Sequence, residues 1–252
     1  MNKIALITGA TSGIGKACAH KLASESYNLI LTGRRKDRLI ALADEVEKNF
    51  GVMVNILCFD VRDKDQVSEH LNSLEDEWKN IDVLINNAGL AAGKDPIDQG
   101  SIEDWDRMID TNVKGLLYVS KVVIPWMTKA KKGDIVNIAS IAGKEVYPDG
   151  NVYCASKFAV DALSQGMRID LVKHGIRVCN IAPGMVETEF SEVRFHGNKE
   201  ISEQVYKGFD ALQSEDIADC IWFAISRPKH VQIGDMLILP SAQASSTIVV
   251  KN

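Results

Sequence analysis

Tyr153 and Lys157 give the most specific chemical signal in this sequence. They are four residues apart in a helical pattern, so their side chains share one helix face. A phenol has a pKa of about 10, too high for a good base at neutral pH, and a nearby ammonium lowers it. Tyr153 is therefore predicted to exchange a proton with a substrate oxygen, and the Ser140 hydroxyl to hold that oxygen. The alternatives are a surface pair and a serine that merely caps a turn.

A glycine-rich turn near the start of the chain predicts a phosphate site. Gly9 permits a tight turn, Gly13 lets the backbone approach a pyrophosphate, and Gly15 lets a helix pack closely on the preceding strand. The helix start offers free N–H groups and a positive dipole end to phosphates. The alternative is a plain turn and helix cap. The residues of this turn expected to bind a nucleotide are Gly9, Thr11, Ser12, Gly13, Ile14 and Gly15.

Arg34 and Arg35 predict which nucleotide is bound. Sites for NAD usually place an acidic residue about 20 residues after the glycine turn, where it binds a ribose hydroxyl. This chain has two arginines there, and a guanidinium binds a phosphate through paired hydrogen bonds. The cofactor is therefore predicted to be NADP(H). The alternative is that both arginines are solvated loop residues.

The elements that position these residues follow an alternating pattern. Nearly continuous apolar runs, typical of strands covered on both faces, are separated by amphipathic stretches. Strands are expected at Lys3–Thr8, Asn28–Thr32, Met53–Phe59, Asp82–Asn86, Asp134–Ala139, Arg177–Ile181 and Met236–Leu239. Helices are expected at Gly13–Ser26, Lys36–Asn49, Lys64–Lys79, Ser101–Lys129, Val152–His174 and Ser214–Ser226. The alternation predicts an α/β fold, a single Rossmann-type doubly wound parallel sheet with helices on both faces.

The length of 252 residues suits one domain, 1–252, that both binds the dinucleotide and carries the catalytic residues. One polar segment, at about 187–210, interrupts the alternation and contains no expected strand. Ligands of such folds bind beyond the carboxyl ends of the strands. This segment follows the sixth expected strand, so it is predicted to be a substrate lid.

Composition excludes several classes of partner. The net charge of -5 and the absence of a basic block argue against nucleic acid. No apolar run is long enough to span a membrane, and the first residues run directly into a strand rather than a signal peptide, so a cytoplasmic protein is expected. The five cysteines and five histidines show no metal-binding spacing, and no metal site is expected.

Several motifs along the chain, in this order, resemble the short-chain dehydrogenase/reductase family. They are the glycine turn, Asn86-Asn87-Ala88-Gly89, Asn112, Ser140, Tyr153-Cys-Ala-Ser-Lys157, Pro183-Gly184 and Thr188. The resemblance implies that Lys157 also binds the nicotinamide ribose and that Asn112 sustains a water relay to it. The alternative for Asn112 is a residue that only kinks or caps its helix. Further cofactor contacts implied by the resemblance are Asp60, Val61, Asn87, Gly89, Tyr153, Pro183, Gly184, Val186 and Thr188.

Within that family, four stretches are similar to the NADP-dependent 3-hydroxy acid dehydrogenases, namely NNAGLAAG, EDWDRMIDTN, GNVYCASK and TEFSEVRFHG. This implies a small-molecule substrate such as serine, allo-threonine or 3-hydroxyisobutyrate, contacted by Ser140 and Tyr153. Its carboxylate needs a cation, and Arg194 in the predicted lid is the candidate. The alternative for Arg194 is a surface salt bridge with Glu189 or Glu192.

The sequence leaves two alternative functions open, and it also predicts an oligomeric state. The family also contains broad-specificity carbonyl reductases for aldehydes, ketones and diketones, and the fold alone does not exclude a non-catalytic NADP-sensing protein. Two expected helices look too apolar to face water alone, which together with the resemblance predicts a homotetramer. Their apolar residues are Val119, Val122, Val123, Trp126, Met127, Ala155, Phe158, Ala159, Ala162, Leu163, Gly166 and Met167.

Overall fold

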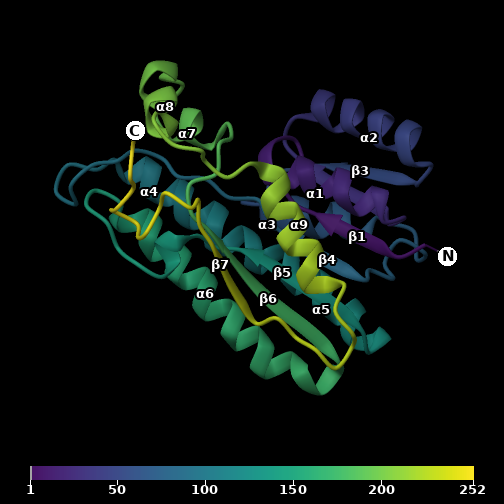
Figure 1. Cartoon of the computed structure of the whole chain (residues 1–252). Helices are drawn as coiled ribbons and strands as arrows, with labels where there is room; N and C mark the ends of the chain where they lie inside the picture. Colours follow the sequence, from purple (N-terminus) through teal and green to yellow (C-terminus); the bar gives the residue numbers. More distant parts are fainter. Residues whose placement is uncertain (1) are drawn as a thin grey trace.

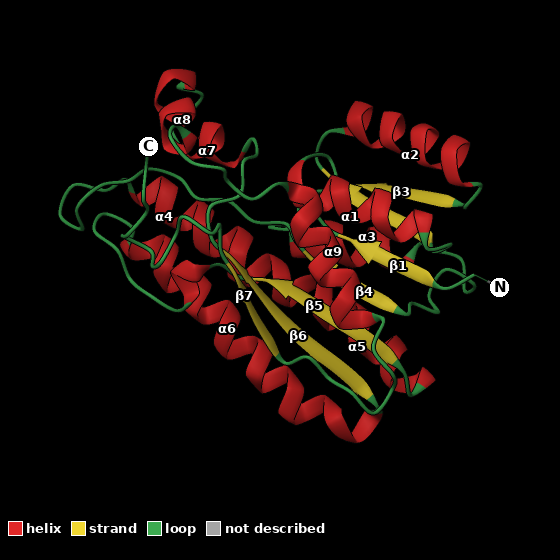
Figure 2. Cartoon of the chain, viewed as in Figure 1, coloured by secondary structure: helices red, strands yellow, loops and turns green. Residues whose placement is uncertain are grey.

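A computed structural model describes residues 2–252 and shows seven parallel strands in one sheet (Figures 1 and 2). The spatial order is β3-β2-β1-β4-β5-β6-β7, so the chain reverses its direction of travel between β1 and β4. This reversal point is where doubly wound folds bind ligands. The strands are β1 (Ile4–Ile7), β2 (Asn28–Gly33), β3 (Val54–Cys58), β4 (Val83–Asn86), β5 (Gly133–Ile138), β6 (Ile176–Pro183) and β7 (Asp235–Ile238).

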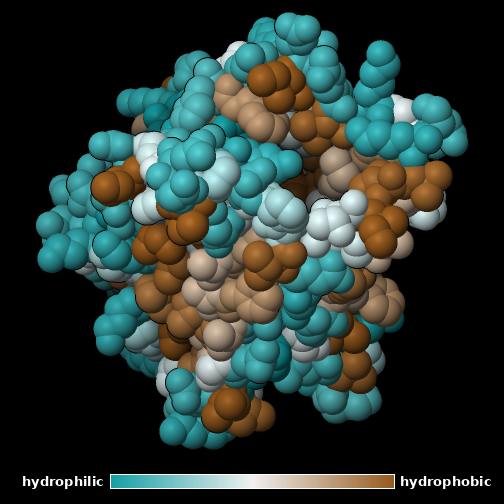
Figure 3. Space-filling model, turned by 90° about the vertical axis from the view of Figure 1, so that its left-hand side faces the viewer, coloured by the Kyte–Doolittle hydropathy of each residue, from teal (hydrophilic) through white to brown (hydrophobic). Residues whose placement is uncertain are grey.

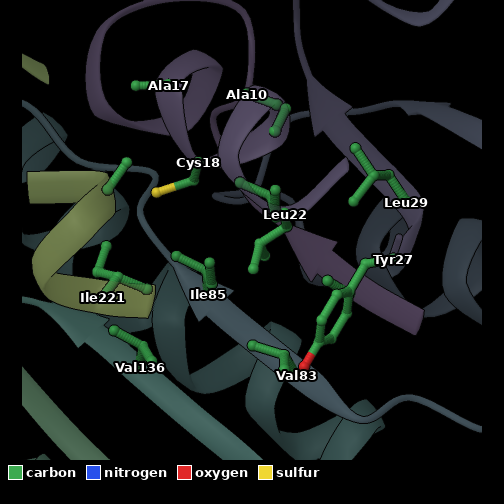
Figure 4. Close-up of a cluster of buried hydrophobic side chains, with 14 of the residues drawn as sticks. Ala10, Ala17, Cys18, Leu22, Tyr27, Leu29, Val83, Ile85, Val136 and Ile221 are labelled. Atoms are coloured by element: carbon green, nitrogen blue, oxygen red, sulfur yellow. The ribbon is translucent and has the colours of Figure 1, made fainter. Parts of the chain in front are cut away.

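Helices cover both faces of the sheet, which confirms the predicted fold class. One face packs on α1 (Gly13–Ser24), α2 (Lys36–Phe50) and α9 (Ser214–Ile225). The other packs on α3 (Lys64–Asn72), α5 (Leu116–Ala130) and α6 (Asn151–Leu171). Figure 4 shows the first layer closing over the sheet, where Leu22 of α1 and Ile221 of α9 meet Ile85 and Val136.

Two predicted helices differ from the structure. The stretch 64–79 is helical only to Asn72, because the chain turns at Ser73, whose hydroxyl donates to the carbonyl of His70. The stretch 101–129 is divided into α4 (Ile102–Ile109), the π-helical turn η1 (Asp110–Gly115) and α5. Short 3-10 turns, η2 (Ile141–Gly143) and η3 (Val172–His174), flank α6.

The segment 187–210 contains two short helices, α7 (Phe190–Arg194) and α8 (Lys199–Tyr206), and no strand. Both lie beyond the sheet and next to the C-terminal end of the chain (Figure 1). The backbone N–H of Asn252 donates to the carbonyl of Gly208 at 2.8 Å, and Lys251 Nζ donates to the carbonyls of Gln204 and Val205. The last residues thus fix the end of α8. No helix within residues 2–252 has the length and apolar character needed to cross a membrane.

Candidate active site

The turn between β1 and α1 brings the backbone close to the site. Gly9 and Gly13 have φ values of +66° and +54°, which side chains with a Cβ rarely adopt. A Cβ on Gly9 would lie 2.9 Å from Cα of Ala88, and one on Gly15 would collide with the Gly9 carbonyl oxygen. Gly9 and Gly15 therefore allow the turn to pack against the end of β4, and Gly13 leaves room for Thr188.

Asn87 and Thr8 hold this turn in place. Asn87 Nδ2 donates to the carbonyls of Thr8 at 2.9 Å and Gly9 at 3.1 Å. The Thr8 hydroxyl oxygen accepts from the backbone N–H groups of Asn87 and Ala88, both at 3.0 Å. Asn86 instead bonds to Ser120 and Asn137 inside the protein. Thr8 was not predicted as a site residue, because one threonine in a buried strand has no distinguishing pattern.

Ser140, Tyr153 and Lys157 come together at the ends of β5 and α6. Tyr153 and Lys157 are only 8% and 5% exposed, so the surface-pair alternative is wrong. Lys157 Nζ lies 5.9 Å from the centre of the Tyr153 ring. The Ser140 hydroxyl oxygen accepts from the backbone N–H of Ala142 at 3.1 Å, so Ser140 caps a turn and also borders the site.

The expected lowering of the Tyr153 pKa is not what the structure shows. Burial raises the pKa of Tyr153 above the ordinary value, while the Ser140 hydroxyl and the Arg194 charge act in the opposite direction. Lys157 does not offset the burial, because its Nζ donates instead to the carbonyl of Ile138 at 2.8 Å. Tyr153 is thus a neutral phenol, suited to donating a proton.

Lys157 is a buried cation without a carboxylate partner. Within residues 2–252, no acidic oxygen lies within 4.0 Å of its Nζ. Burial lowers its pKa from 10.5 to about 8. A Cβ built on Gly89 would lie 3.4 Å from this Nζ, so the glycine keeps the space beside the ammonium open.

Asn112 lies in the π-helical turn, an element often found at functional sites. Its Nδ2 donates to the Leu90 carbonyl at 2.8 Å and to the Ser156 hydroxyl at 2.9 Å. Its Oδ1 accepts from the Leu90 N–H at 2.8 Å. The side chain therefore ties the turn to the end of β4 and to α6, close to Lys157.

The two predicted phosphate-binding arginines have different surroundings. Arg35 donates to the hydroxyls of Thr11 and Ser12 and to the carboxylate of Glu189. Arg34 is exposed and lies 3.8 Å from Asp60. Arg38, which was not predicted as a site residue, also binds Glu189, at 2.6 Å. The Arg38–Glu189 pair spans 151 residues of sequence, so no local pattern reveals it.

Arg194 of α7 turns toward Tyr147 and Tyr153. Its guanidinium carbon lies 5.5 Å from the ring centre of Tyr147 and 5.7 Å from that of Tyr153. Its Nε donates to the Gly93 carbonyl at 3.3 Å, and its Nη2 is buried without a hydrogen-bond partner. The predicted alternative, a salt bridge to Glu189 or Glu192, is absent among the described residues, because Glu189 binds Arg35 and Arg38 instead.

One cavity of about 520 Å³ joins these features. Of the residues predicted from the sequence, only Gly15 and Asn112 do not border it. Those that do are Gly9, Thr11, Ser12, Gly13, Ile14, Arg34, Arg35, Asp60, Val61, Asn87, Gly89, Ser140, Tyr153, Lys157, Pro183, Gly184, Val186, Thr188 and Arg194. Other residues that border the cavity include Tyr147, Phe190, Tyr206, Gln243 and Ser246.

This arrangement suits a dinucleotide beside a small anion. Guanidinium groups, the glycine turn and a buried ammonium offer partners for a 2′-phosphate, a pyrophosphate and ribose hydroxyls. Tyr153 can move a proton, and Arg194 can bind a negative charge next to it. Among residues 2–252, no group of three or more His, Cys, Asp or Glu side chains is placed to hold a metal ion.

Known proteins are similar to this chain in both sequence and fold. The family described as short chain dehydrogenase matches residues 3–199. The NADP-dependent 3-hydroxy acid dehydrogenase YdfG of Salmonella typhi is 42% identical over 98% of both chains. Sulfoacetaldehyde reductase 2 of Chromohalobacter salexigens is 41% identical over 99% of both. The closed form of a serine dehydrogenase complexed with NADP+ superposes with a TM-score of 0.92 at 41% identity, covering 99% of each chain.

Proposed function

Because this chain belongs to the short-chain dehydrogenase family, we propose that it transfers a hydride between NADP(H) and the 3-hydroxyl carbon of a small 3-hydroxy acid. Relatives named for NADP dependence and for 3-hydroxy acids, and the NADP+-bound structural neighbour, support this function. The observation that carries the substrate class is the buried, unpartnered Nη2 of Arg194 beside Tyr153. A carboxylate at that nitrogen would satisfy it.

The reaction needs one proton transfer by the protein. When bound, the nicotinamide supplies or accepts the hydride. In reduction the Tyr153 phenol gives its proton to the carbonyl oxygen and is left as a phenolate. In oxidation the phenol first loses its own proton to solvent, and the phenolate then takes the hydroxyl proton of the substrate. Ser140 holds the same oxygen by a hydrogen bond. Lys157 would hold the nicotinamide ribose, and Asn112, through its bonds to Leu90 and Ser156, would position the backbone around Lys157.

The remaining residues of the cavity hold the cofactor. The glycine turn binds the pyrophosphate, and Arg35 with Arg34 binds the 2′-phosphate. Asp60 and Val61 would lie against the adenine, and Val186 and Thr188 would lie near the nicotinamide. Asn87, Gly89, Pro183 and Gly184, which border the same cavity, would make further contacts with the cofactor. The segment 187–210 covers the substrate as a lid.

A second candidate is the reduction of small aldehydes that carry an anionic group. The similarity to sulfoacetaldehyde reductase 2 favours it, because a sulfonate presents the same negative charge to Arg194 as a carboxylate does. Both candidates use the same proton donor and the same cation. They differ in the acid group of the substrate, a carboxylate or a sulfonate, and in the preferred direction of the reaction, oxidation or reduction.

Initial rates of NADP+ reduction with several 3-hydroxy acids test both the proposed function and the role of Arg194. We expect NADP+ reduction with L-serine, L-allo-threonine and 3-hydroxyisobutyrate, and little with NAD+. Arg194→Gln should lower kcat/KM for these acids roughly tenfold to a hundredfold, the usual value of a charge-assisted hydrogen bond. The methyl ester of 3-hydroxyisobutyrate, which has no charge, is the matched control and should lose little. An equal loss for acid and ester would contradict the carboxylate contact, and turnover of sulfoacetaldehyde alone would favour the second candidate.

The apolar residues of α5 named in the sequence are buried in the chain's own core or packed against it, so they do not require an interface. We also propose a cytoplasmic homotetramer that uses α6. Ala155, Phe158, Ala162 and Ile169 form an exposed stripe along α6, with Phe158 and Ile169 exposed by 40% and 76%. Figure 3 shows hydrophobic side chains gathered on the side of the molecule where α4 and α6 lie in Figure 1. Symmetric association would bury this surface. Light scattering at micromolar concentration should give the mass of four chains, and a single-chain mass would contradict the assembly.

A further inference from the structure

Residues 240–252, which we call the C-terminal segment, follow β7 and fold back beside the cavity. Gln243 and Val249 form an isolated antiparallel bridge within this segment. The backbone N–H of Ser246 donates to the Glu145 carboxylate at 2.8 Å, in the loop after η2. Gln243 and Ser246 both border the cavity, so the C-terminal segment forms part of its wall.

The Gln243 side chain is buried against the end of β6, with an exposed fraction of 5%. Its Oε1 accepts from the backbone N–H of Met185 at 2.9 Å, and its Nε2 donates to the carbonyl of Ser245 at 3.1 Å. A Cβ on Gly184 would collide with this Oε1, so the glycine gives the amide access to the backbone. Met185 borders the cavity next to Val186, which is proposed to lie near the nicotinamide. Gln243 therefore fixes the backbone of this wall.

The C-terminal segment also contacts α8, the helix of the lid that borders the cavity with Val205 and Tyr206. Lys251 Nζ donates to the Val205 carbonyl at 3.2 Å, where the last turn of α8 leaves its carbonyls without partners. The backbone N–H of Asn252 donates to the Gly208 carbonyl at 2.8 Å. Figure 1 shows the end of the chain beside α8.

Helix α8 has few other anchors. Only Ser202 of its eight residues is buried. The Tyr206 hydroxyl bonds to Ser191 in α7 and to the carbonyl of Val186, where the lid begins. In the part of the chain that the structure describes, all other hydrogen bonds from α8 and Gly208 to residues outside the lid come from the C-terminal segment. The position of α8 over the cavity therefore depends on that segment.

We propose that the C-terminal segment positions two walls of the active site. Gln243 holds the backbone beside the nicotinamide position, and Lys251 with Asn252 holds α8 over the substrate. The kinetic consequences rest on the hydride transfer proposed above. Because the two contacts act on different walls, they affect different steps. Loss of the Gln243 contact misaligns the reacting atoms and lowers kcat, whereas loss of the contacts to α8 lowers the fraction of closed enzyme and raises KM.

The double variant Lys251→Met/Asn252→Pro tests the contacts to α8, because methionine has no N–H donor and proline has no backbone N–H. Both residues are exposed, so the fold should be kept. Hydrogen exchange of the α8 amides, with and without NADP+, should be roughly threefold to tenfold faster than in the wild type. KM for 3-hydroxyisobutyrate should rise by a similar factor, while kcat and NADP+ affinity stay within about twofold. Lys251→Arg/Asn252→Ala keeps every donor and is the matched control, which should behave as the wild type does.

Gln243→Met tests the other wall. The Met185 amide should exchange faster, kcat should fall roughly tenfold and KM should stay within about twofold. Gln232→Met is the matched control, because Gln232 Oε1 accepts from the N–H of Val178 at 2.9 Å, in the same strand but away from the cavity. Its kcat should not change.

Unchanged exchange of α8 in the double variant, or an equal loss of kcat in Gln232→Met and Gln243→Met, would overturn the inference. If the wild-type protein turns over no 3-hydroxy acid, the proposed function fails by itself. Exchange at α8 and at the Met185 amide, which needs no substrate, would then still show whether the C-terminal segment holds both walls.

Discussion

Replacing Tyr153 by phenylalanine is expected to lower kcat about 10³-fold while NADP+ still binds, because general acid–base catalysis contributes roughly 10² to 10⁴. The ring of Tyr153 packs 5.7 Å from that of Phe190 and is 8% exposed, so phenylalanine keeps the packing and removes only the hydroxyl. Burial raises the pKa of Tyr153, which keeps the phenol neutral and able to donate a proton over the range in which the enzyme is assayed. Single-turnover reduction with bound NADPH measures the loss directly.

Tyr147→Phe is the matched control for this substitution. Tyr147 borders the same cavity, burial raises its pKa, and Arg194 lies over its ring as it does over that of Tyr153. The loss of kcat in Tyr147→Phe should be less than about tenfold, because Tyr147 is not assigned a proton transfer. NADPH affinity, followed by nucleotide fluorescence, should change little in either variant. Equal losses of kcat in Tyr153→Phe and Tyr147→Phe would contradict the assignment of the proton transfer to Tyr153.

The sheet and its main helices were predictable from the sequence because their signals are local and repeated. Buried strands give continuous apolar runs, and the covering helices give a 3.6-residue period. The π-helical turn at Asn112 was not predictable in this way. It depends on hydrogen bonds to Leu90 and Ser156, which are 22 and 44 residues away in sequence. Helices α7 and α8 are also short and mostly polar, so they were predicted only as an irregular lid.

The site was predictable where residue type and spacing determine chemistry, and less so where burial determines it. Tyr153 and Lys157 were identified by their spacing, but the direction of the Tyr153 pKa shift was wrong. Spacing predicted an ammonium acting on the phenol, whereas in the structure desolvation is the larger effect and Lys157 bonds to a backbone carbonyl. Contacts between distant segments, such as Arg38 with Glu189, required the fold.

Replacing Lys157 by methionine is expected to abolish most activity and, at the same time, to stabilise the fold. The buried ammonium has no carboxylate partner and donates one hydrogen bond, to Ile138. Its pKa falls from 10.5 to about 8, and each unit is worth 1.36 kcal/mol, so keeping Lys157 charged costs about 3 kcal/mol of folding free energy. Methionine removes this cost and leaves one carbonyl unpaired, a loss of about 1 kcal/mol. A net gain of about 2 kcal/mol at pH 7 follows.

The pH dependence of the stability difference between Lys157→Met and the wild type separates this explanation from a simple improvement in packing. Below pH 8 Lys157 is charged in both states, and the full cost opposes folding. Between pH 8 and 10.5 the unfolded chain binds the proton more strongly, so wild-type stability from this group rises with pH and the advantage of the variant shrinks. Urea unfolding at pH 7 and pH 9.5 measures the free energy of unfolding of Lys157→Met and of the wild type at each pH. Lys173→Met, a substitution at an exposed lysine, should show neither the gain in stability nor its decrease with pH. A variant that is less stable than wild type, or whose advantage is equal at both pH values, would contradict the cost assigned to the ammonium. Because the residue proposed to hold the cofactor ribose is also a buried cation without a carboxylate partner, stability and activity are expected to be opposed at this position.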